Sequence, residues 1–342
     1  MQLTGPAKLL DVTQLRKTFA LPSRNPFGAH PSLIAVNDVS LSLGAGEVLG
    51  LVGESGSGKS TVGRCILRLT EPDDGQIVFA GRDITHLSRR ALRPVRRAMQ
   101  LIFQDPFGSL NPRMTVGRIL ATPLLIHEPR LRAAERGQRV ADALRLVGLP
   151  IEAVQRFPHE FSGGQRQRIC IARALMLRPD FIVADEPVSA LDVSVQGQIV
   201  NLLEQLRATF GLAMLFISHD LAVVGHISDR IAVMYLGRIM ELGPSAAIIG
   251  APRHPYTEAL LSAVPTIRSQ SRQRIVLSGE MPSPVSPPSG CVFRTRCPYA
   301  LPRCAEETPA LRQMDTGRFS ACIRDDLELQ KAQPASSRRL SA

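Results

Sequence analysis

Short apolar runs alternate with helical patterns along most of this chain. Strands are predicted within residues 9–20 and 33–52, where apolar and polar positions alternate in places. The almost wholly apolar runs 181–185 (FIVAD) and 212–218 (LAMLFIS) lie on either side of a helical pattern over 193–209. Apolar strands that alternate with helices are typical of a parallel sheet covered on both faces. The pattern therefore predicts an α/β fold.

Other stretches depart from this alternation. Between residues 105 and 165, Arg-rich helical patterns replace the strands, which predicts a helical subdomain inserted into the α/β core. The alternation then returns and ends with the apolar segment 229–242. Residues 278–290 are rich in proline and serine and show no periodicity, so we expect a linker or an extended strap there.

Length, hydropathy and charge indicate a globular protein. The 342 residues suffice for one large α/β domain and a smaller unit, and a hydrophobic content of 44% supports a sizeable core. No apolar run approaches the roughly 18 residues of a membrane span, and the first residues lack the regions of a signal peptide, so we expect a cytoplasmic protein. The net charge of +11 would suit nucleic acid or an anionic membrane surface, but the basic residues are spread along the chain.

The first chemical motif is a glycine-rich loop. Gly53, Gly58, Lys59 and Ser60 match the phosphate-loop pattern G-x-x-x-x-G-K-[ST], and a helical pattern over 59–69 follows. Backbone N–H groups of such a loop surround phosphate oxygens, the lysine reaches the β and γ phosphates, and the serine offers a hydroxyl to Mg²⁺. The alternative, a glycine-rich turn before an ordinary helix, is disfavoured by this context. The predicted nucleotide contacts are Gly53, Glu54, Ser55, Gly56, Ser57, Gly58, Lys59, Ser60 and Thr61.

An acidic pair ends the apolar run at residues 181–185. Asp185 is expected to hold Mg²⁺ through water, and Glu186 is placed to polarise the attacking water as a general base. The alternative is a surface pair that caps a strand. A phosphate loop in the same predicted sheet favours the catalytic interpretation.

The sequence FSGGQ at residues 161–165, followed by RQRICIARAL, resembles the signature motif of the ABC ATPases. It is physically a second anion-binding helix start, with Ser162 as its N-cap. In the family, the signature of one subunit closes over the nucleotide held by the phosphate loop of another. Because each motif occurs once here, the resemblance implies a head-to-tail dimer with an identical or homologous ATPase subunit. The signature residues implied to contact that nucleotide are Ser162, Gly163, Gly164 and Gln165.

Further family elements follow in the expected order. Gln104 resembles the Q-loop glutamine, which senses Mg²⁺ and the attacking water and links to the membrane subunit. Residues 189–192, which include Asp192, resemble the D-loop that touches the opposite subunit. His219 resembles the switch histidine that contacts the γ phosphate, and Phe19 resembles the adenine-stacking aromatic residue, although Tyr is more usual there. The implied catalytic residues are Glu186, His219 and Gln104, and the implied Mg²⁺ site is Ser60, Gln104 and Asp185.

Three stretches resemble most closely the ATPase subunits of bacterial dipeptide and oligopeptide importers: residues 103–117, 253–265 and 287–304. The resemblance implies an α/β fold: a P-loop NTPase core with a mostly parallel sheet, an N-terminal antiparallel β subdomain, an inserted α-helical subdomain and a small Cys-containing C-terminal extension. The implied division is an ATPase domain over 1–265, with the helical subdomain at about 105–165, an extension over 266–330 and a disordered tail over 331–342.

The implied activity is ATP hydrolysis at a dimer interface, coupled to peptide import through two integral membrane permease subunits. The protein would lie at the cytoplasmic face of the bacterial inner membrane, with an extracytoplasmic peptide-binding protein as an indirect partner and no nucleic acid. Related importers of nickel, glutathione or other small solutes share most of these features, so this alternative stays open. ABC ATPases that act on DNA usually carry long insertions, and ribosome-binding factors generally carry two ATPase halves; this chain has neither.

The six cysteines fall into two groups. Cys65 and Cys170 stand alone in apolar or helical context and are expected to be small buried hydrophobes. The other four lack the C-x-x-C spacing of common zinc ribbons, but four thiolates in a short stretch can surround a metal centre. The importer resemblance implies a four-iron four-sulfur cluster, and zinc or simple reduced cysteines remain alternatives. The four residues are Cys291, Cys297, Cys304 and Cys322.

Overall fold

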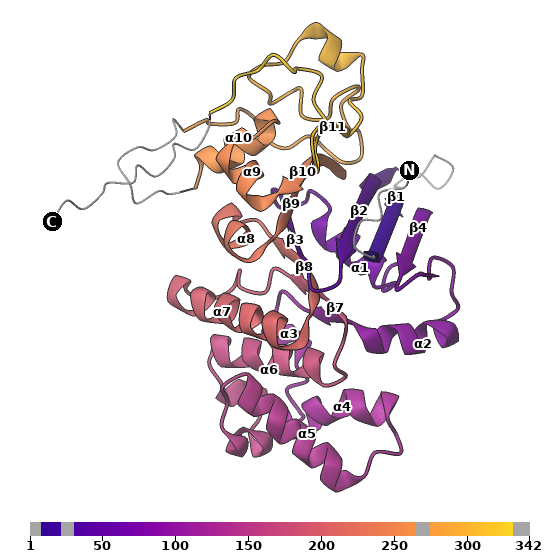
Figure 1. The fold of residues 1–342 in the computed structure, drawn as a ribbon, viewed down its shortest axis with the longest axis vertical. Coiled ribbons are helices and arrows are strands. Elements are labelled where there is room, and N and C mark those ends of the chain that lie inside the picture. The colour runs from indigo at the N-terminus through magenta and orange to yellow at the C-terminus, as the bar shows by residue number, and fades with distance from the viewer. Residues whose placement is uncertain (1–7, 22–30, 265–273, 331–342) are drawn as a thin grey trace, which may run out of the picture.

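The computed structural model describes residues 8–21, 31–264 and 274–330 (Figure 1). The expected tail over 331–342 and the expected domain boundary at residues 265 and 266 lie outside the described residues. Figure 1 shows the helical subdomain and the C-terminal unit at opposite ends of the long axis, with the sheets between them. Across the described ranges, no helix combines the length and apolar character that crossing a membrane requires.

A four-stranded antiparallel sheet carries the N-terminal part of the chain, in the order β2-β1-β4-β5. Val12 of its second strand lies opposite Leu41 and Ile77 of the two neighbouring strands, and all three side chains are buried. This apolar face explains why the alternating segments near the N-terminus form strands. The strands are β1 (Lys8–Ala20), β2 (Ser32–Gly44), β4 (Asp74–Phe79) and β5 (Arg82–Asp83). The expected antiparallel β subdomain is confirmed.

An eight-stranded sheet forms the centre of the molecule, in the order β11-β12-β10-β9-β3-β8-β7-β6. Strands β3, β6, β7, β8 and β9 pair in parallel, whereas β10, β11 and β12 pair antiparallel. The bounds are β3 (Val48–Val52), β6 (Met99–Ile102), β7 (Phe181–Asp185), β8 (Ala213–Ser218), β9 (Arg230–Tyr235), β10 (Arg238–Pro244), β11 (Arg312–Asp315) and β12 (Arg318–Ser320). The mostly parallel sheet is confirmed, and the apolar segment 229–242 is a β9–β10 hairpin.

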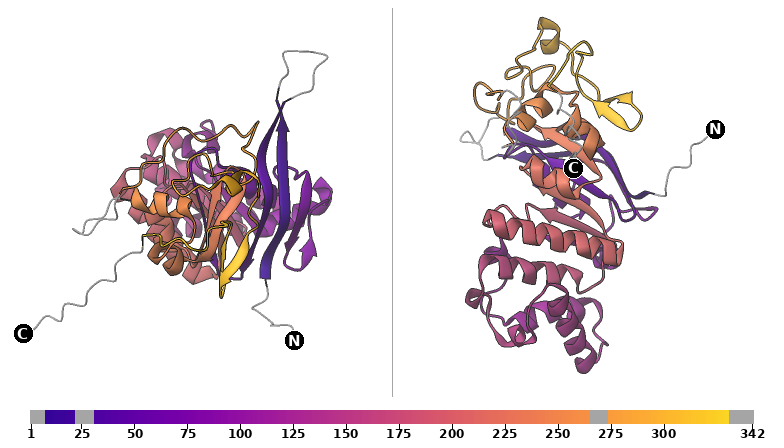
Figure 2. Two further views of the ribbon diagram at one scale, coloured as in Figure 1. Left: turned by 90° about the horizontal axis from the view of Figure 1, so that it is seen from above. Right: turned by 60° about the vertical axis from the view of Figure 1, so that its left-hand side comes forward.

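Both faces of the central sheet are buried. Leu49 and Leu51 of β3 face a core shared with α1 and the antiparallel sheet, which stands beside the central sheet in Figure 2. Val48 and Val52 face a second core with α6, α7 and α8, because successive side chains of a strand point to opposite faces. The helices are α1 (Lys59–Ile66), α6 (Gly163–Leu175), α7 (Val193–Phe210) and α8 (Leu221–Ile227). Two-sided burial accounts for the nearly uninterrupted apolar runs.

Helix α1 ends at Ile66, earlier than the predicted end at residue 69. Arg68 adopts a left-handed conformation with φ of 51°, and its N–H bonds the Cys65 carbonyl oxygen. The buried Arg68 side chain also donates to the carbonyl oxygens of Ile84 and Thr85. These bonds stabilise a helix end that the apolar periodicity alone does not predict.

Helices fill the chain between β6 and β7, as the inserted helical subdomain requires. Most of their buried side chains join the core that also contains α6 and α7. The elements are α3 (Pro106–Ser109), α4 (Val116–His127), α5 (Ala133–Leu146), η1 (Ile151–Gln155) and η2 (Pro158–Glu160), and α2 (Arg89–Ala98) precedes β6.

The C-terminal unit continues the central sheet. Residues 274–290 form neither helix nor strand, in agreement with the expected strap. Strand β12 then pairs with β10, and buried Glu241 of β10 accepts a 3.0 Å bond from Arg318 of β12. The remaining elements are α9 (Ser245–Gly250), α10 (Pro255–Ser262) and η3 (Pro302–Ala305).

Candidate active site

The glycine-rich loop joins the end of β3 to the start of α1, and packing requires two of its glycines. A Cβ at Gly53 would lie 2.1 Å from the Met234 carbonyl oxygen. A Cβ at Gly58, where φ is 102°, would lie 2.1 Å from the Ala35 carbonyl oxygen. The first turn of α1 has neither a side-chain cap nor an acidic residue. Its N–H groups therefore remain available to an anion.

Lys59 lies inside this loop, with 4% of its surface exposed. Its Nζ donates 2.8 Å hydrogen bonds to the carbonyl oxygens of Gly53 and Glu54. Burial lowers the pKa of Lys59, and the carboxylates of Glu186 and Asp185 act in the opposite direction. Since the ammonium has already lost much of its hydration, an anion brought beside it interacts strongly. The loop thus fits a polyanionic ligand.

Ser60 and Asp185 meet although 125 residues separate them. The Ser60 hydroxyl donates a 2.7 Å bond to Asp185 Oδ1, and Asp185 is 3% exposed at the end of β7. Burial raises the pKa of Asp185, while the Ser60 bond lowers it. A hydroxyl and a carboxylate are the hard oxygen ligands that Mg²⁺ prefers. This pair therefore fits the predicted Mg²⁺ site.

Two of the three predicted catalytic side chains, Gln104 and His219, approach one carboxylate oxygen of the third, Glu186. Gln104 Nε2 donates a 3.0 Å bond to Glu186 Oε2, and His219 Nδ1 lies 3.5 Å from the same oxygen. Glu186 directly follows β7 and adopts φ of 45°, and its N–H bonds the Ile217 carbonyl oxygen of β8. The strained turn directs the carboxylate into a cluster at the carboxyl edge of the sheet.

The predicted signature residues form a separate helix start. Ser162 Oγ accepts from the Gln165 N–H, and Gln165 Oε1 accepts from the Ser162 N–H, at 3.3 and 3.0 Å. A Cβ at Gly163 would lie 3.4 Å from Leu191, so the predicted D-loop packs beside this motif. Among the described residues, no hydrogen bond or ion pair joins residues 162–165 to residues 53–61. The structure thus brings the signature and the D-loop together, apart from the phosphate loop.

Comparisons with known proteins agree with this site. The family model described as "ABC transporter" matches residues 36–189, and the model described as "Oligopeptide/dipeptide transporter, C-terminal region" matches residues 240–304. A Brucella ovis protein named for peptide import and ATP binding is 58% identical over 86% of this chain and 93% of its own length. The oligopeptide transport ATP-binding protein AppF of Bacillus subtilis is 52% identical over 94% of this chain and 99% of its own length. The chain belongs to the ABC transporter ATP-binding family.

Solved structures place the same fold in dimers. A dimeric ATP-binding cassette in a post-hydrolysis state with ADP and Pi has a TM-score of 0.62 and 28% identity, covering 69% of this chain and 98% of its own. The protein cbiO1 from Clostridium perfringens, part of the ABC transporter complex cbiONQ, has a TM-score of 0.60 and 26% identity, covering 70% of this chain and 90% of its own. ABC ATPases bind ATP with Mg²⁺, which agrees with the buried Lys59 ammonium and the contact between Ser60 and Asp185.

In this ABC ATPase, the two remaining predicted contacts lie on β1 and at the start of α7. Phe19 is 39% exposed near the end of β1, with Lys17 Nζ 5.4 Å from the ring centroid. The ring is therefore partly exposed, and an exposed aromatic ring can stack on a base. Asp192 is the N-cap residue of α7, and its side chain makes no capping bond.

Sequence motifs missed two side chains that hold the phosphate loop. The Tyr256 hydroxyl accepts a 2.9 Å bond from the Glu54 N–H, and Arg296 Nη1 donates to both carboxylate oxygens of Glu54. Both belong to segments that the importer resemblance covers, but neither lies in an ATP motif. Only the folded structure brings them to the loop.

The four C-terminal cysteines line one small cavity of about 20 Å³, which has room for about one water molecule. All four are free thiols, and burial raises the pKa of Cys297 to about 12. Cys304 and Cys322 each accept a 3.4 Å backbone N–H bond at sulfur. The thiol donor set fits a metal centre, but over the described ranges no three His, Cys, Asp or Glu side chains adopt a metal-ligating arrangement. Cys65 and Cys170 are fully buried, as expected.

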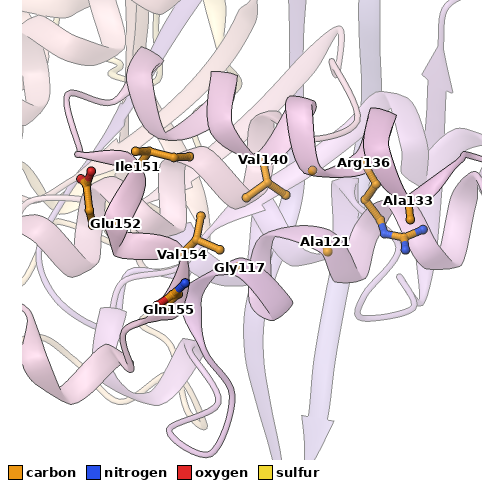
Figure 3. A pocket seen from close by; sticks show the side chains of 10 residues that line it. Gly117, Ala121, Ala133, Arg136, Val140, Ile151, Glu152, Val154 and Gln155 are labelled. Carbon is orange, nitrogen blue, oxygen red and sulfur yellow. The ribbon is translucent and has the colours of Figure 1, made fainter.

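A further hollow of about 500 Å³ lies in the helical subdomain, between α4, α5 and η1 (Figure 3). The residues that line it include Gly117, Ala121 and Val140, which Figure 3 labels. None of the predicted site residues lines it. The hollow is therefore separate from the ATP site.

Proposed function

We propose that this chain is the ATP-hydrolysing subunit of a bacterial ABC importer for dipeptides and oligopeptides. The main support for ATP hydrolysis is that Gln104 and His219 both approach Glu186 Oε2. This cluster lies at the carboxyl edge of the central sheet, where Ser60 and Asp185 also meet. The peptide cargo is supported by the match over residues 240–304 and by the names of the relatives.

The chemistry assigned to the site follows from its charges. N–H groups of the loop and the Lys59 ammonium bind the phosphates, and Phe19 stacks on the adenine. Ser60 and Asp185, with Gln104, would hold Mg²⁺, which when bound supplies charge neutralisation to the β and γ phosphates. Glu186 accepts the proton of the attacking water. His219, whose Nδ1 lies 3.5 Å from Glu186 Oε2, would contact the γ phosphate.

Hydrolysis in this proposal needs a second ATPase subunit, identical or homologous. Ser162 and the following residues of one subunit, with Asp192, would close over the nucleotide on the phosphate loop of the other. The proposal is supported by the absence of same-chain bonds between the two motifs among the described residues, and by the dimeric form of the solved relatives. A closed head-to-tail dimer would contain two complete ATP sites, each formed by the phosphate loop of one subunit and the signature of the other.

The permease subunits would dock in a groove of about 430 Å³ between β6, α4 and α6. Leu69, Phe103 and Ile126 line this groove and are 53%, 40% and 52% exposed, which is unusual for large apolar side chains. Phe103 directly precedes Gln104, so a docked segment could act on the catalytic cluster. The subunit would thus lie on the cytoplasmic face of the inner membrane, with an extracytoplasmic peptide-binding protein delivering cargo.

We also propose that residues 266–330 form a unit distinct from the ATPase domain over 1–265, and that its four cysteines hold a four-iron four-sulfur cluster of structural role. The proposal is supported by the gathering of all four cysteines around one point of the fold and by the two N–H bonds to sulfur. Brown protein with about four irons per chain after anaerobic purification is the expected result. Stoichiometric zinc, or colourless metal-free protein, would refute it.

An assay of peptide uptake by whole cells tests the assignment of peptides as the cargo. A strain carrying Lys59→Ala should lose uptake of labelled dipeptides, tripeptides and pentapeptides, because the loop loses its buried cation. Lys8→Ala is the matched control, since Lys8 makes an exposed ion pair with Asp11. Unchanged peptide uptake with a defect only for nickel or glutathione would overturn the peptide assignment and favour a related importer.

A further inference from the structure

The phosphate loop is tied to the C-terminal unit by an ion pair. Arg296 Nη1 lies 3.0 and 2.8 Å from the two carboxylate oxygens of Glu54, the second residue of the loop. The arginine side chain is 9% exposed and the glutamate side chain 29%. The two residues are 242 positions apart, so the C-terminal unit folds back onto the loop.

Two further contacts hold the same part of the loop. The Tyr256 hydroxyl of α10 accepts a hydrogen bond from the Glu54 N–H, so the backbone of Glu54 is held as well as its side chain. Met281 of the strap packs against Gly56, with its Cε 3.2 Å from where a Cβ on Gly56 would lie. Residues from beyond the last ATP motif therefore contact the loop at Glu54 and Gly56, while Ser55 and Gly56 stay exposed.

The contact between Arg296 and Glu54 is supported by a buried aromatic cluster. Tyr235, Tyr256 and Phe293 are fully buried and form an aromatic cluster with ring centroids 4.7 to 5.3 Å apart. Arg296 follows Phe293 by three residues and lies 6.0 Å from the Tyr235 ring centroid. Since the cluster fixes the chain at Phe293, the guanidinium is held in place before any nucleotide binds.

We propose that Arg296 is a positioning residue for the phosphate loop. Through Arg296, the C-terminal unit sets the affinity of the loop for ATP. Glu54 carries a negative charge in the loop that receives the phosphates, and this charge acts on Lys59. Arg296 neutralises the carboxylate and holds it to one side, so that it does not repel the incoming phosphates. The inference rests on the proposed binding of ATP by this loop.

Arg296→Ala tests this role. The Kd for a non-hydrolysable ATP analogue, measured by calorimetry with Mg²⁺, should rise about five- to tenfold, and KM for ATP should rise while kcat changes by less than about twofold. Arg296→Lys should restore most of the affinity, because a single nitrogen makes both contacts to Glu54. Arg294→Ala is the matched control: Arg294 belongs to the same unit, but within the described ranges the hydrogen bonds of its side chain go to Ser289 and not to the phosphate loop.

A mutant cycle separates positioning from a general structural effect. In a Glu54→Gln background the repelling charge is absent, so Arg296→Ala should change Kd by less than about twofold. An equal loss of affinity in both backgrounds, or no loss in either, overturns the proposal. If Arg296→Ala melts at a lower temperature, Arg296→Met keeps the buried stem and carries the same test. A wild-type protein that binds no ATP would instead refute the proposed function.

Discussion

Replacing Glu186 by Gln removes the proposed general base but preserves its shape. The backbone at residue 186 has φ of 45° and is fixed by a 3.0 Å bond to Ile217, and Gln meets the same conformational demand. The amide oxygen can still accept from Gln104, which lies 3.0 Å from Glu186 Oε2. Folding should therefore change little. A general base contributes about 10²- to 10⁴-fold in rate, which corresponds to about 3–5 kcal/mol of the barrier.

Phosphate release is the direct assay for this variant. We expect the kcat of Glu186→Gln to fall at least about 100-fold while the Kd for ATP stays near the wild-type value. The ATP-bound dimer should also accumulate and elute earlier in size-exclusion chromatography with Mg²⁺ and ATP. Glu204→Gln makes the same chemical change on α7 and should leave turnover unaltered. Unchanged turnover in Glu186→Gln, or equal loss of binding and turnover, would refute the general-base assignment.

Two predictions concern stability. Arg318→Ala leaves the fully buried Glu241 without its 3.0 Å partner, so the free energy of unfolding in urea should fall by about 3 kcal/mol. Arg312→Ala breaks an exposed pair with Asp325 and should cost less than about 1 kcal/mol; equal losses would contradict this reasoning. Burial lowers the pKa of His254 to about 3 in the folded protein. Between about pH 6.5 and pH 3 the imidazole therefore binds a proton in the unfolded chain but not in the folded one, and the free energy of unfolding falls as the pH drops through this range. His254→Gln should reduce that slope by up to about 1.4 kcal/mol per pH unit, and an unchanged slope would contradict the assignment.

The parts of the fold that the sequence predicts best are those whose burial dictates composition. The run FIVAD coincides with β7 (Phe181–Asp185), because a strand covered on both faces has no polar side. The meeting of Ser60 and Asp185 follows from the same logic. Asp185 is the last residue of β7, and Ser60 lies in the first turn of α1, which the loop after β3 leads into. The carboxyl ends of these parallel strands share one edge of the sheet. Spacing and topology together thus predict the centre of the site.

Local pattern fails where tertiary contacts decide the structure. Strands β11 and β12 have four and three residues and read RQMD and RFS, too short and too polar to show a period. They are strands because β12 pairs with β10 and Arg318 neutralises buried Glu241. The early end of α1 likewise depends on Arg68 reaching the carbonyl oxygens of Ile84 and Thr85, which no window around residue 68 contains.

The contact between Glu54 and Arg296 joins a residue of a predictable motif to a residue that only the tertiary structure brings there. Glu54 occupies a position at which the phosphate-loop motif accepts any residue, and Arg296 is one of many arginines in this chain, so neither residue stands out in the sequence. A carboxylate so near the phosphates would weaken ATP binding if it were left uncompensated. The loop can carry it because a residue 242 positions away supplies the opposite charge from a rigid aromatic base. The C-terminal unit can therefore affect nucleotide binding without contacting the reacting atoms, and a comparison of motifs alone would leave that dependence out.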